Sequence, residues 1–96
     1  RIADHFEGIA PYAKYRVRCT DIDVGGHMNN TAYVRMIMGS LSNEERKALP
    51  IRRMDVIFRA SCYEGDVLSF RRKETEDGLD IRVSRGEEMV LLVRIR

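Results

Sequence analysis

Positions 21 to 33 of the chain read Asp21-Ile22-Asp23-Val24-Gly25-Gly26-His27-Met28-Asn29-Asn30-Thr31-Ala32-Tyr33. This stretch places two carboxylates, two glycines and a histidine directly before an apolar segment that has the period of a helix. The first turn of a helix has unpaired backbone N–H groups and a partial positive charge, so a developing oxyanion can be stabilised there. The loop and the helix start together predict a site for a reaction at a carbonyl group.

The side chains of this loop suggest their own roles. Asp23 would activate a water molecule or attack the carbonyl carbon directly, and burial near Met28 and Met36 would raise its basicity. His27 would orient Asp23 or protonate the leaving group. The backbone N–H groups of residues 29–31 would bind the oxyanion.

Two other features of the loop have simpler interpretations. Asp21 is expected in a solvated turn or at a cap, and the Gly25-Gly26 pair in a tight loop. The spacing of Asp21, Asp23 and Gly25 is that of the start of a calcium-binding loop, but the glutamate that such a loop places later is missing. We therefore predict neither a metal nor a cofactor.

The sequence on both sides of the loop predicts a strand and a helix. Residues 15–19 alternate apolar side chains with arginines, which is the period of a half-buried strand. Asn29 or Asn30 is expected to cap the helix that follows the loop. The apolar residues of this helix recur at helical spacing, at Tyr33, Val34, Ile37, Met38 and Leu41.

The rest of the chain predicts a short helix and four antiparallel strands. Ser42 and Glu45 form a capping-box pattern for the short helix, which Pro50 ends. Residues 79–84 alternate apolar and polar side chains, as a half-buried strand does, and residues 89–95 are dense in apolar side chains, which indicates a central strand. The turn signals are Glu64-Gly65-Asp66, Asp77-Gly78 and Arg85-Gly86-Glu87.

Only one of the predicted helices is long enough to cover a face of a sheet. A curved antiparallel sheet wrapped around that helix satisfies the burial that both elements need. The predicted fold is therefore α+β, as a single domain over residues 1–96.

Composition limits the classes of function. Hydrophobic residues make up 44% and charged residues 33% of the chain, which is typical of a soluble globular domain. A net charge of +2 is too small to indicate a nucleic-acid partner, and no apolar run is long enough to span a membrane. The clusters Arg52-Arg53 and Arg71-Arg72-Lys73 are interpreted as solvated strand faces, with a docking surface for an acidic partner as the alternative. Cys19 and Cys62 are expected as free thiols of a cytoplasmic protein.

The stretch from Asp21 to Tyr33 resembles the first signature motif of the acyl-acyl carrier protein thioesterases, a branch of the hotdog-fold thioesterases. The segment Arg59-Ala60-Ser61-Cys62-Tyr63-Glu64-Gly65-Asp66-Val67-Leu68 is similar to the second motif of that family, a Glu-Cys pair followed by a Gly/Asp turn. The resemblance implies a hotdog fold, which agrees with the predicted sheet and helix. It also implies a cytoplasmic thioesterase that hydrolyses fatty acyl thioesters of acyl carrier protein in fatty acid biosynthesis.

Position by position, the resemblance implies that Asp23 and His27 are catalytic. Cys62 matches the cysteine of the second motif and is implied to be catalytic as well, whereas its own sequence context favours a buried, inert thiol. Gly25 and Ser61 occupy the positions of the family's functional asparagine and glutamate. Two polar side chains of the family's site are therefore absent.

Asn29, Asn30 and Tyr33 complete the first motif and are implied to bind the substrate. Members of the family usually carry two hotdog domains, and this chain resembles the C-terminal one. We expect a homodimer of the single domain, because a lone sheet would expose an edge and an apolar groove. Two alternatives are left open: a non-catalytic acyl-binding or pairing domain, and an acyl-coenzyme A thioesterase.

Overall fold

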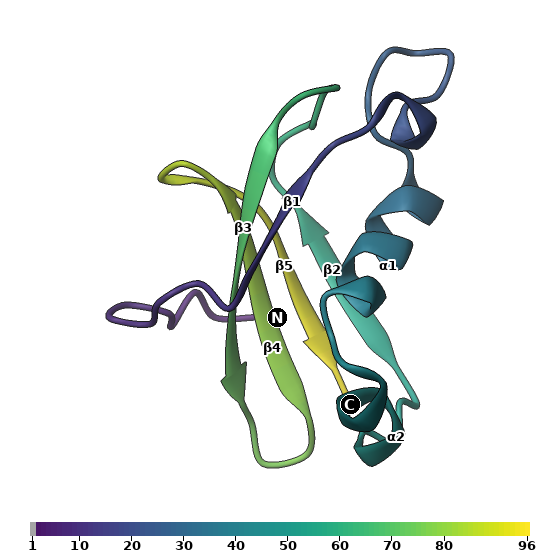
Figure 1. Cartoon of the computed structure of the whole chain (residues 1–96). Coiled ribbons are helices and arrows are strands. Elements are labelled where there is room, and N and C mark those ends of the chain that lie inside the picture. The colour runs from purple at the N-terminus through teal and green to yellow at the C-terminus, as the bar shows by residue number, and fades with distance from the viewer. Residues whose placement is uncertain (1) are drawn as a thin grey trace.

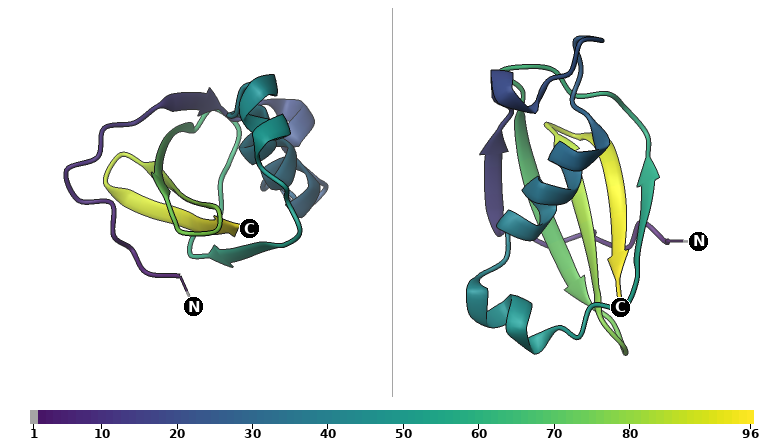
Figure 2. Two further views of the ribbon diagram at one scale, coloured as in Figure 1. Left: turned by 90° about the horizontal axis from the view of Figure 1, so that it is seen from below. Right: turned by 90° about the vertical axis from the view of Figure 1, so that its right-hand side faces the viewer.

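Eight elements follow one another along residues 2–96, the part of the chain that the computed structural model describes (Figure 1). In chain order they are β1 (Ala13–Arg16), a 3₁₀ turn (Cys19–Asp21), α1 (Asn30–Gly39), α2 (Asn43–Ala48), β2 (Met54–Phe58), β3 (Val67–Glu74), β4 (Leu79–Arg85) and β5 (Glu88–Ile95). The strands form one antiparallel sheet in the order β1-β3-β4-β5-β2. The sheet curves around α1, so the predicted α+β layout is confirmed (Figure 2).

Both helices begin where their capping residues predict. The cap of α1 is Asn29, whose side-chain oxygen accepts a hydrogen bond from the N–H of Ala32 at 2.9 Å. At the start of α2, the side chains of Ser42 and Glu45 each accept a hydrogen bond from the backbone N–H of the other, which confirms the capping box. The cap at Asn29 sets the point at which α1 begins, directly after the loop.

The helix α1 packs against the sheet through a stripe that differs from the prediction at several positions: Met38 is only half-buried, and Ala32 and Met36 are buried although the prediction did not include them. Val34 was expected in this stripe but is 43% exposed. It lies about 100° around the helix from Tyr33, on the side turned away from the sheet. The buried residues of α1 are Ala32, Tyr33, Met36 and Ile37.

The strand β1 is shorter than the alternation of residues 15–19 predicts. It ends at Arg16, and Cys19, which was expected in the strand, begins the 3₁₀ turn. A carboxylate oxygen of Asp21 accepts a hydrogen bond from the N–H of Arg18 at 2.9 Å. This local bond holds the chain in a turn in place of an extended strand.

The N-terminal segment, residues 2–9, crosses the face of the sheet opposite α1 (Figure 2). Beneath it, Asp80 is fully buried, and Arg94 donates to both of its carboxylate oxygens at 2.8 Å. His5, from the segment itself, bonds to the same carboxylate at 2.9 Å. The half-buried pattern predicted for residues 79–84 is therefore wrong on its polar face, because the segment covers that face.

The strand β5 pairs with β4 on one side and β2 on the other, so its predicted interior position is confirmed. Within residues 2–96, the strands β1 and β2 each pair with a single neighbour and form the two edges of the sheet. None of the helices in this part of the chain has the length and apolar character needed to cross a membrane.

Candidate active site

The two sequence motifs, far apart along the chain, meet at the backbone of Cys62. The N–H of Met28 donates to the carbonyl oxygen of Cys62 at 2.9 Å, and the N–H of Cys62 donates to the hydroxyl oxygen of Tyr33 at 3.2 Å. The rings of His27 and Tyr63 also meet edge to face, with their centroids 6.0 Å apart. The two motifs are therefore held side by side by these contacts.

Asp21 holds the loop from the inside. The residue is only 2% exposed, and its side chain accepts hydrogen bonds from the hydroxyl of Tyr15 at 2.6 Å and from the N–H of Arg18 at 2.9 Å. The guanidinium of Arg35 lies 3.5 Å from its other oxygen. Burial opposes ionisation of Asp21, but the hydrogen bonds outweigh it and hold the pKa of this carboxyl below its ordinary value. Asp21 was expected in a solvated turn or at a cap: it is not solvated, and its bond to the N–H of Arg18 is part of the cap of the 3₁₀ turn.

Gly25 lies between Asp23 and His27. Its N–H donates to Oδ1 of Asp23 at 2.8 Å and so orients the carboxylate. A β-carbon at position 25 would stand 3.1 Å from that oxygen and 3.5 Å from Cε1 of His27. The tight loop requires Gly26 alone to take a left-handed conformation, with φ of 86°. Asp23 and His27 are both exposed, so the apolar burial expected for Asp23 is not found in this chain.

The start of α1 opens beside these two side chains. The side chain of Asn29 accepts a hydrogen bond from the N–H of Ala32 at 2.9 Å, and its carbonyl oxygen accepts one from the N–H of Tyr33 at 3.1 Å. Among the described residues, no hydrogen bond is formed by the backbone N–H groups of Asn30 and Thr31. Two free N–H groups at a helix N-terminus can stabilise an anion. Of the backbone N–H groups of residues 29–31 that were expected to bind the oxyanion, those of Asn30 and Thr31 are therefore the candidates.

Two shallow depressions adjoin at this surface. The first, which we call the site hollow, is lined by Thr20, Asp23, His27, Met28, Asn29, Asn30, Thr31 and Arg35. The second, the Phe58 hollow, is lined by Met28, Asn30, Tyr33, Phe58, Arg59, Ala60 and Ser61. Met28 and Asn30 line both, so one surface continues into the other. In the described part of the chain, no group of three or more His, Cys, Asp and Glu side chains could hold a metal ion.

The second motif contributes Ser61 to this surface but keeps Cys62 beneath it. Ser61, at the family's glutamate position, lines the Phe58 hollow. Cys62 is fully buried and lines neither hollow, and burial raises the pKa of its thiol. Burial also raises the pKa of Tyr33, whose hydroxyl oxygen is engaged by Cys62. In this structure, Cys62 and Tyr33 therefore have a structural role: the hydrogen bond between them joins the two motifs.

Sequence reasoning missed three residues of this surface. Arg35 follows Thr31 by four residues and therefore lies on the same side of α1. This spacing would have identified Arg35 as a residue of the site. Phe58, which is 47% exposed, stacks edge to face on Tyr33 with ring centroids 5.2 Å apart. Tyr15 reaches the loop from β1. No local pattern identifies Phe58 and Tyr15, because both act through contacts between separate elements.

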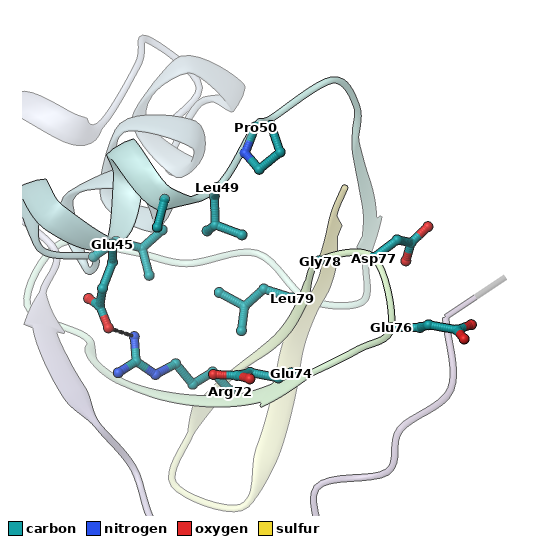
Figure 3. A pocket seen from close by; sticks show the side chains of 11 residues that line it. Glu45, Leu49, Pro50, Arg72, Glu74, Glu76, Asp77, Gly78 and Leu79 are labelled. Atoms are coloured by element: carbon teal, nitrogen blue, oxygen red, sulfur yellow. Dashed lines mark ion pairs between the residues drawn. The ribbon is translucent and has the colours of Figure 1, made fainter.

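Another hollow lies at the opposite end of α1, between α2 and the β3–β4 hairpin (Figure 3). Its volume is about 440 Å³. Glu45 and Arg72 pair across it at 2.6 Å, and Leu49 and Leu79 point into it (Figure 3). None of the predicted site residues lines this hollow, so it is separate from the surface that joins the motifs.

Comparisons with known proteins agree with this arrangement. The sequence model of the family described as acyl-ACP thioesterase C-terminal domain matches residues 9–93. The crystal structure of an acyl-ACP thioesterase from Bacteroides thetaiotaomicron is similar to the chain, with a TM-score of 0.81 and 30% identity over 88% of this chain and 36% of that one. A 1,4-dihydroxy-2-naphthoyl-CoA thioesterase from Synechocystis shares the fold, with a TM-score of 0.70 and 16% identity over 92% of this chain and 79% of that one. No curated protein matches in sequence. The predicted hotdog fold is confirmed, and the chain spans little more than a third of the Bacteroides protein.

Proposed function

Because the chain belongs to the family of acyl-ACP thioesterase C-terminal domains, we propose that it hydrolyses the thioester bond between a fatty acyl group and acyl carrier protein. The reaction would release free fatty acid from fatty acid biosynthesis in the cytoplasm, a location with which the free Cys19 and Cys62 are compatible. One observation carries the proposal: Asp23, His27 and the free N–H groups at the start of α1 share the site hollow. A base, an acid and donors for an oxyanion are what attack of water on a carbonyl requires.

Asp23 is the base of the proposed reaction. Gly25 binds its Oδ1, and the other carboxylate oxygen takes a proton from a water molecule. The water oxygen then bonds to the thioester carbon, and the carbonyl oxygen takes up negative charge beside the N–H groups of Asn30 and Thr31. When the oxyanion collapses, the C–S bond breaks and the imidazolium form of His27 protonates the leaving thiolate. The proton that Asp23 took from the water molecule then passes through solvent to His27, which returns both groups to their starting states. The products are a carboxylic acid and a free thiol.

A second hotdog domain would complete this site. Asp23, His27 and Phe58 are exposed, and the adjacent strand β2 has a free edge among the described residues. A domain paired along β2 would cover the hollows and exclude water, which strengthens the electrostatic interactions inside. We therefore propose that residues 1–96 form one hotdog domain, the C-terminal half of a tandem protein, and that two copies pair when no other hotdog domain is present.

A non-catalytic acyl-binding domain is a second candidate function. Gly25 offers no side chain to position a water molecule, and Ser61 places a hydroxyl where the family has a carboxylate. With both substitutions, the hollows would hold an acyl thioester without cleaving it. An acyl-coenzyme A thioesterase is the third reading, because coenzyme A presents the same thioester group as the carrier protein.

Release of free thiol from acyl-acyl carrier protein tests the proposal, with the full-length protein and its Asp23→Asn variant. Asparagine keeps the size of aspartate but cannot take the proton, so we expect kcat to fall about a hundredfold, or about 3 kcal/mol in the barrier, with Tm unchanged. Glu64→Gln, in an exposed turn outside both hollows, is the control and should keep the parental rate.

Equal rates for the parent and Asp23→Asn would remove Asp23 from the role of base. A parent that binds acyl-acyl carrier protein but releases no thiol would instead support the acyl-binding function.

A further inference from the structure

A fourth depression, which we call the basic hollow, lies between β1 and α1. Its volume is about 380 Å³. Its lining includes three cationic side chains and three apolar or aromatic ones, namely Lys14, Arg18 and Arg35, and Tyr15, Met36 and Phe70. Arg35 lines the site hollow as well, so the two depressions share a wall.

The cations of the basic hollow are available to an anion. Lys14 and Arg18 take part in none of the ion pairs among residues 2–96. The guanidinium carbon of Arg18 lies 5.9 Å from the centre of the Tyr15 ring, which supports its position. Asp21 is buried and accepts a hydrogen bond from the hydroxyl of Tyr15, and it contacts one nitrogen of the Arg35 guanidinium at 3.5 Å. This contact orients Arg35, and the N–H donors of the guanidinium that face solvent stay free.

The basic hollow extends along α1, away from the place proposed for the thioester carbon. Arg35, Met36 and Gly39 of α1 and the C-cap residue Ser40 line it, and the chain rises about 14 Å between Thr31 and Ser40. Gly39 has no side chain to obstruct this wall, and a β-carbon there would meet nothing within 4 Å. A pantetheine arm has about thirteen bonds between its sulfur and its phosphorus, so it reaches about 15 Å when extended, like a peptide chain of equal bond number.

We propose that Lys14, Arg18 and Arg35 bind the phosphate of a phosphopantetheine arm whose thioester lies in the site hollow. The assignment rests on the proposed function, since this arm is the part of the thioester substrate that acyl carrier protein and coenzyme A share. Phosphate oxygens accept the charge-assisted hydrogen bonds that guanidinium and ammonium groups donate. The acyl chain then leaves the site hollow on its other side, across Met28 and into the Phe58 hollow.

Two double variants with the same change in charge test this assignment in the full-length protein. Lys14→Gln with Arg18→Gln, the rim variant, removes two cations of the basic hollow. Arg46→Gln with Lys47→Gln, the control, removes two exposed cations of α2 that line none of the four hollows. Each is assayed with one acyl group attached to N-acetylcysteamine, to 4′-phosphopantetheine, to coenzyme A and to acyl carrier protein.

The rim variant should raise KM about tenfold for the three thioesters that carry phosphate, since it removes charge-assisted hydrogen bonds. Its kcat, and its rate with the N-acetylcysteamine thioester, should match those of the parent. The control variant should match the parent with all four substrates. If the rim variant loses as much activity with the N-acetylcysteamine thioester as with the phosphate-bearing thioesters, the assignment is overturned. An equally large rise of KM in the control variant also overturns it. A loss confined to the carrier-protein thioester also overturns it, because the cations would then recognise the protein and not the phosphate.

Failure of the proposed function gives a different result. If the parent hydrolyses none of the four thioesters, the enzyme proposal fails, and calorimetry still tests the phosphate site. The parent should then bind 4′-phosphopantetheine about tenfold more tightly than pantetheine, and the rim variant should bind the two equally. Equal binding of both by the parent overturns the phosphate site independently of any activity.

Discussion

The hydroxyl oxygen of Tyr33 accepts a hydrogen bond from the backbone N–H of Cys62 at 3.2 Å, so α1 holds the second motif directly. Both groups are buried, and the carbonyl of Cys62 is bonded in turn to the N–H of Met28 at 2.9 Å. Ser61, one residue before this joint, lines the Phe58 hollow. The position of the second motif at the site therefore depends on a hydroxyl in the first.

Replacement of Tyr33 by Phe should destabilise the domain. The buried N–H of Cys62 would lose its acceptor, at a cost of about 1–3 kcal/mol in the free energy of unfolding, while the ring contact with Phe58 remains. Urea denaturation measures the change. Tyr63→Phe is the control, because Tyr63 is half exposed, and it should stay within about 0.5 kcal/mol of the parent. Equal effects of the two variants would deny the Tyr33 hydroxyl this structural role.

Cys62 should behave as a structural thiol. Because it is fully buried and burial raises the pKa of its thiol, we expect a thiol reagent to label exposed Cys19 at least a hundredfold faster under native conditions. Cys62→Ala should cost about 1–2 kcal/mol of stability and leave kcat within a factor of two. Loss of all activity in a folded Cys62→Ala protein would restore Cys62 as a catalytic residue.

The double variant Gly25→Asn with Ser61→Glu should gain thioesterase activity over the parent. Position 25 does not need a left-handed backbone, so asparagine fits there once Oδ1 of Asp23 yields a few tenths of an ångström to the new β-carbon. Both positions lie at the site, and we expect kcat/KM to rise at least tenfold because positioning and base functions are restored. Initial rates of thiol release for the parent, both single variants and the double variant provide the comparison. A folded double variant with the parental rate would contradict the match of these positions to the family's motifs.

Asp80 should contribute to the loss of stability in acid. Burial would raise its pKa, but hydrogen bonds from Arg94 and His5 outweigh this and hold the pKa of Asp80 below its ordinary value of 3.8. A carboxyl with a lowered native pKa stabilises the fold above its unfolded pKa, and this contribution is lost as the pH falls through the native pKa. Asp80→Asn should therefore cost about 2–3 kcal/mol at pH 7 and flatten the decline of stability below about pH 4.

Denaturation of Asp80→Asn at a series of pH values measures both effects. Asp55→Asn is the control, since its ion pairs with Arg53 and Arg96 are more exposed, and it should cost at most about 1 kcal/mol. An unchanged slope in acid for Asp80→Asn would show that other carboxyls set the acid limit.

The isolated chain should form a homodimer through β2. Sedimentation at high micromolar concentration should give the mass of a dimer, because pairing would satisfy the free edge of β2 and cover Phe58. Phe58→Glu should shift the equilibrium toward monomer, whereas Val67→Glu, at an exposed apolar position of β3, should not. A monomeric parent at this concentration would reject the pairing.

Local chemistry made much of the fold predictable from the sequence. Asn29 and Ser42 mark the helix starts through their own hydrogen bonds to the backbone. The turn at Asp77-Gly78 closes through a hydrogen bond from the N–H of Thr75 to the carbonyl of Gly78, although the backbone of Ile95 also excludes a side chain at Gly78. The alternation of residues 79–84 indicated a strand correctly, but it did not reveal that Asp80 would be covered. The segment that covers it comes from the other end of the chain.

The sequence by itself determined which chemical groups stand near the start of α1, because Asp23, His27 and the helix cap are neighbours along the chain. Tertiary structure alone decided how they are used. It buried Asp21 against Tyr15, placed the backbone of Cys62 between the motifs, and left Asp23 exposed. The physical reason is that burial and hydrogen bonds between separate elements arise only when the sheet closes around the helix, and no pattern along the chain encodes which distant groups then meet.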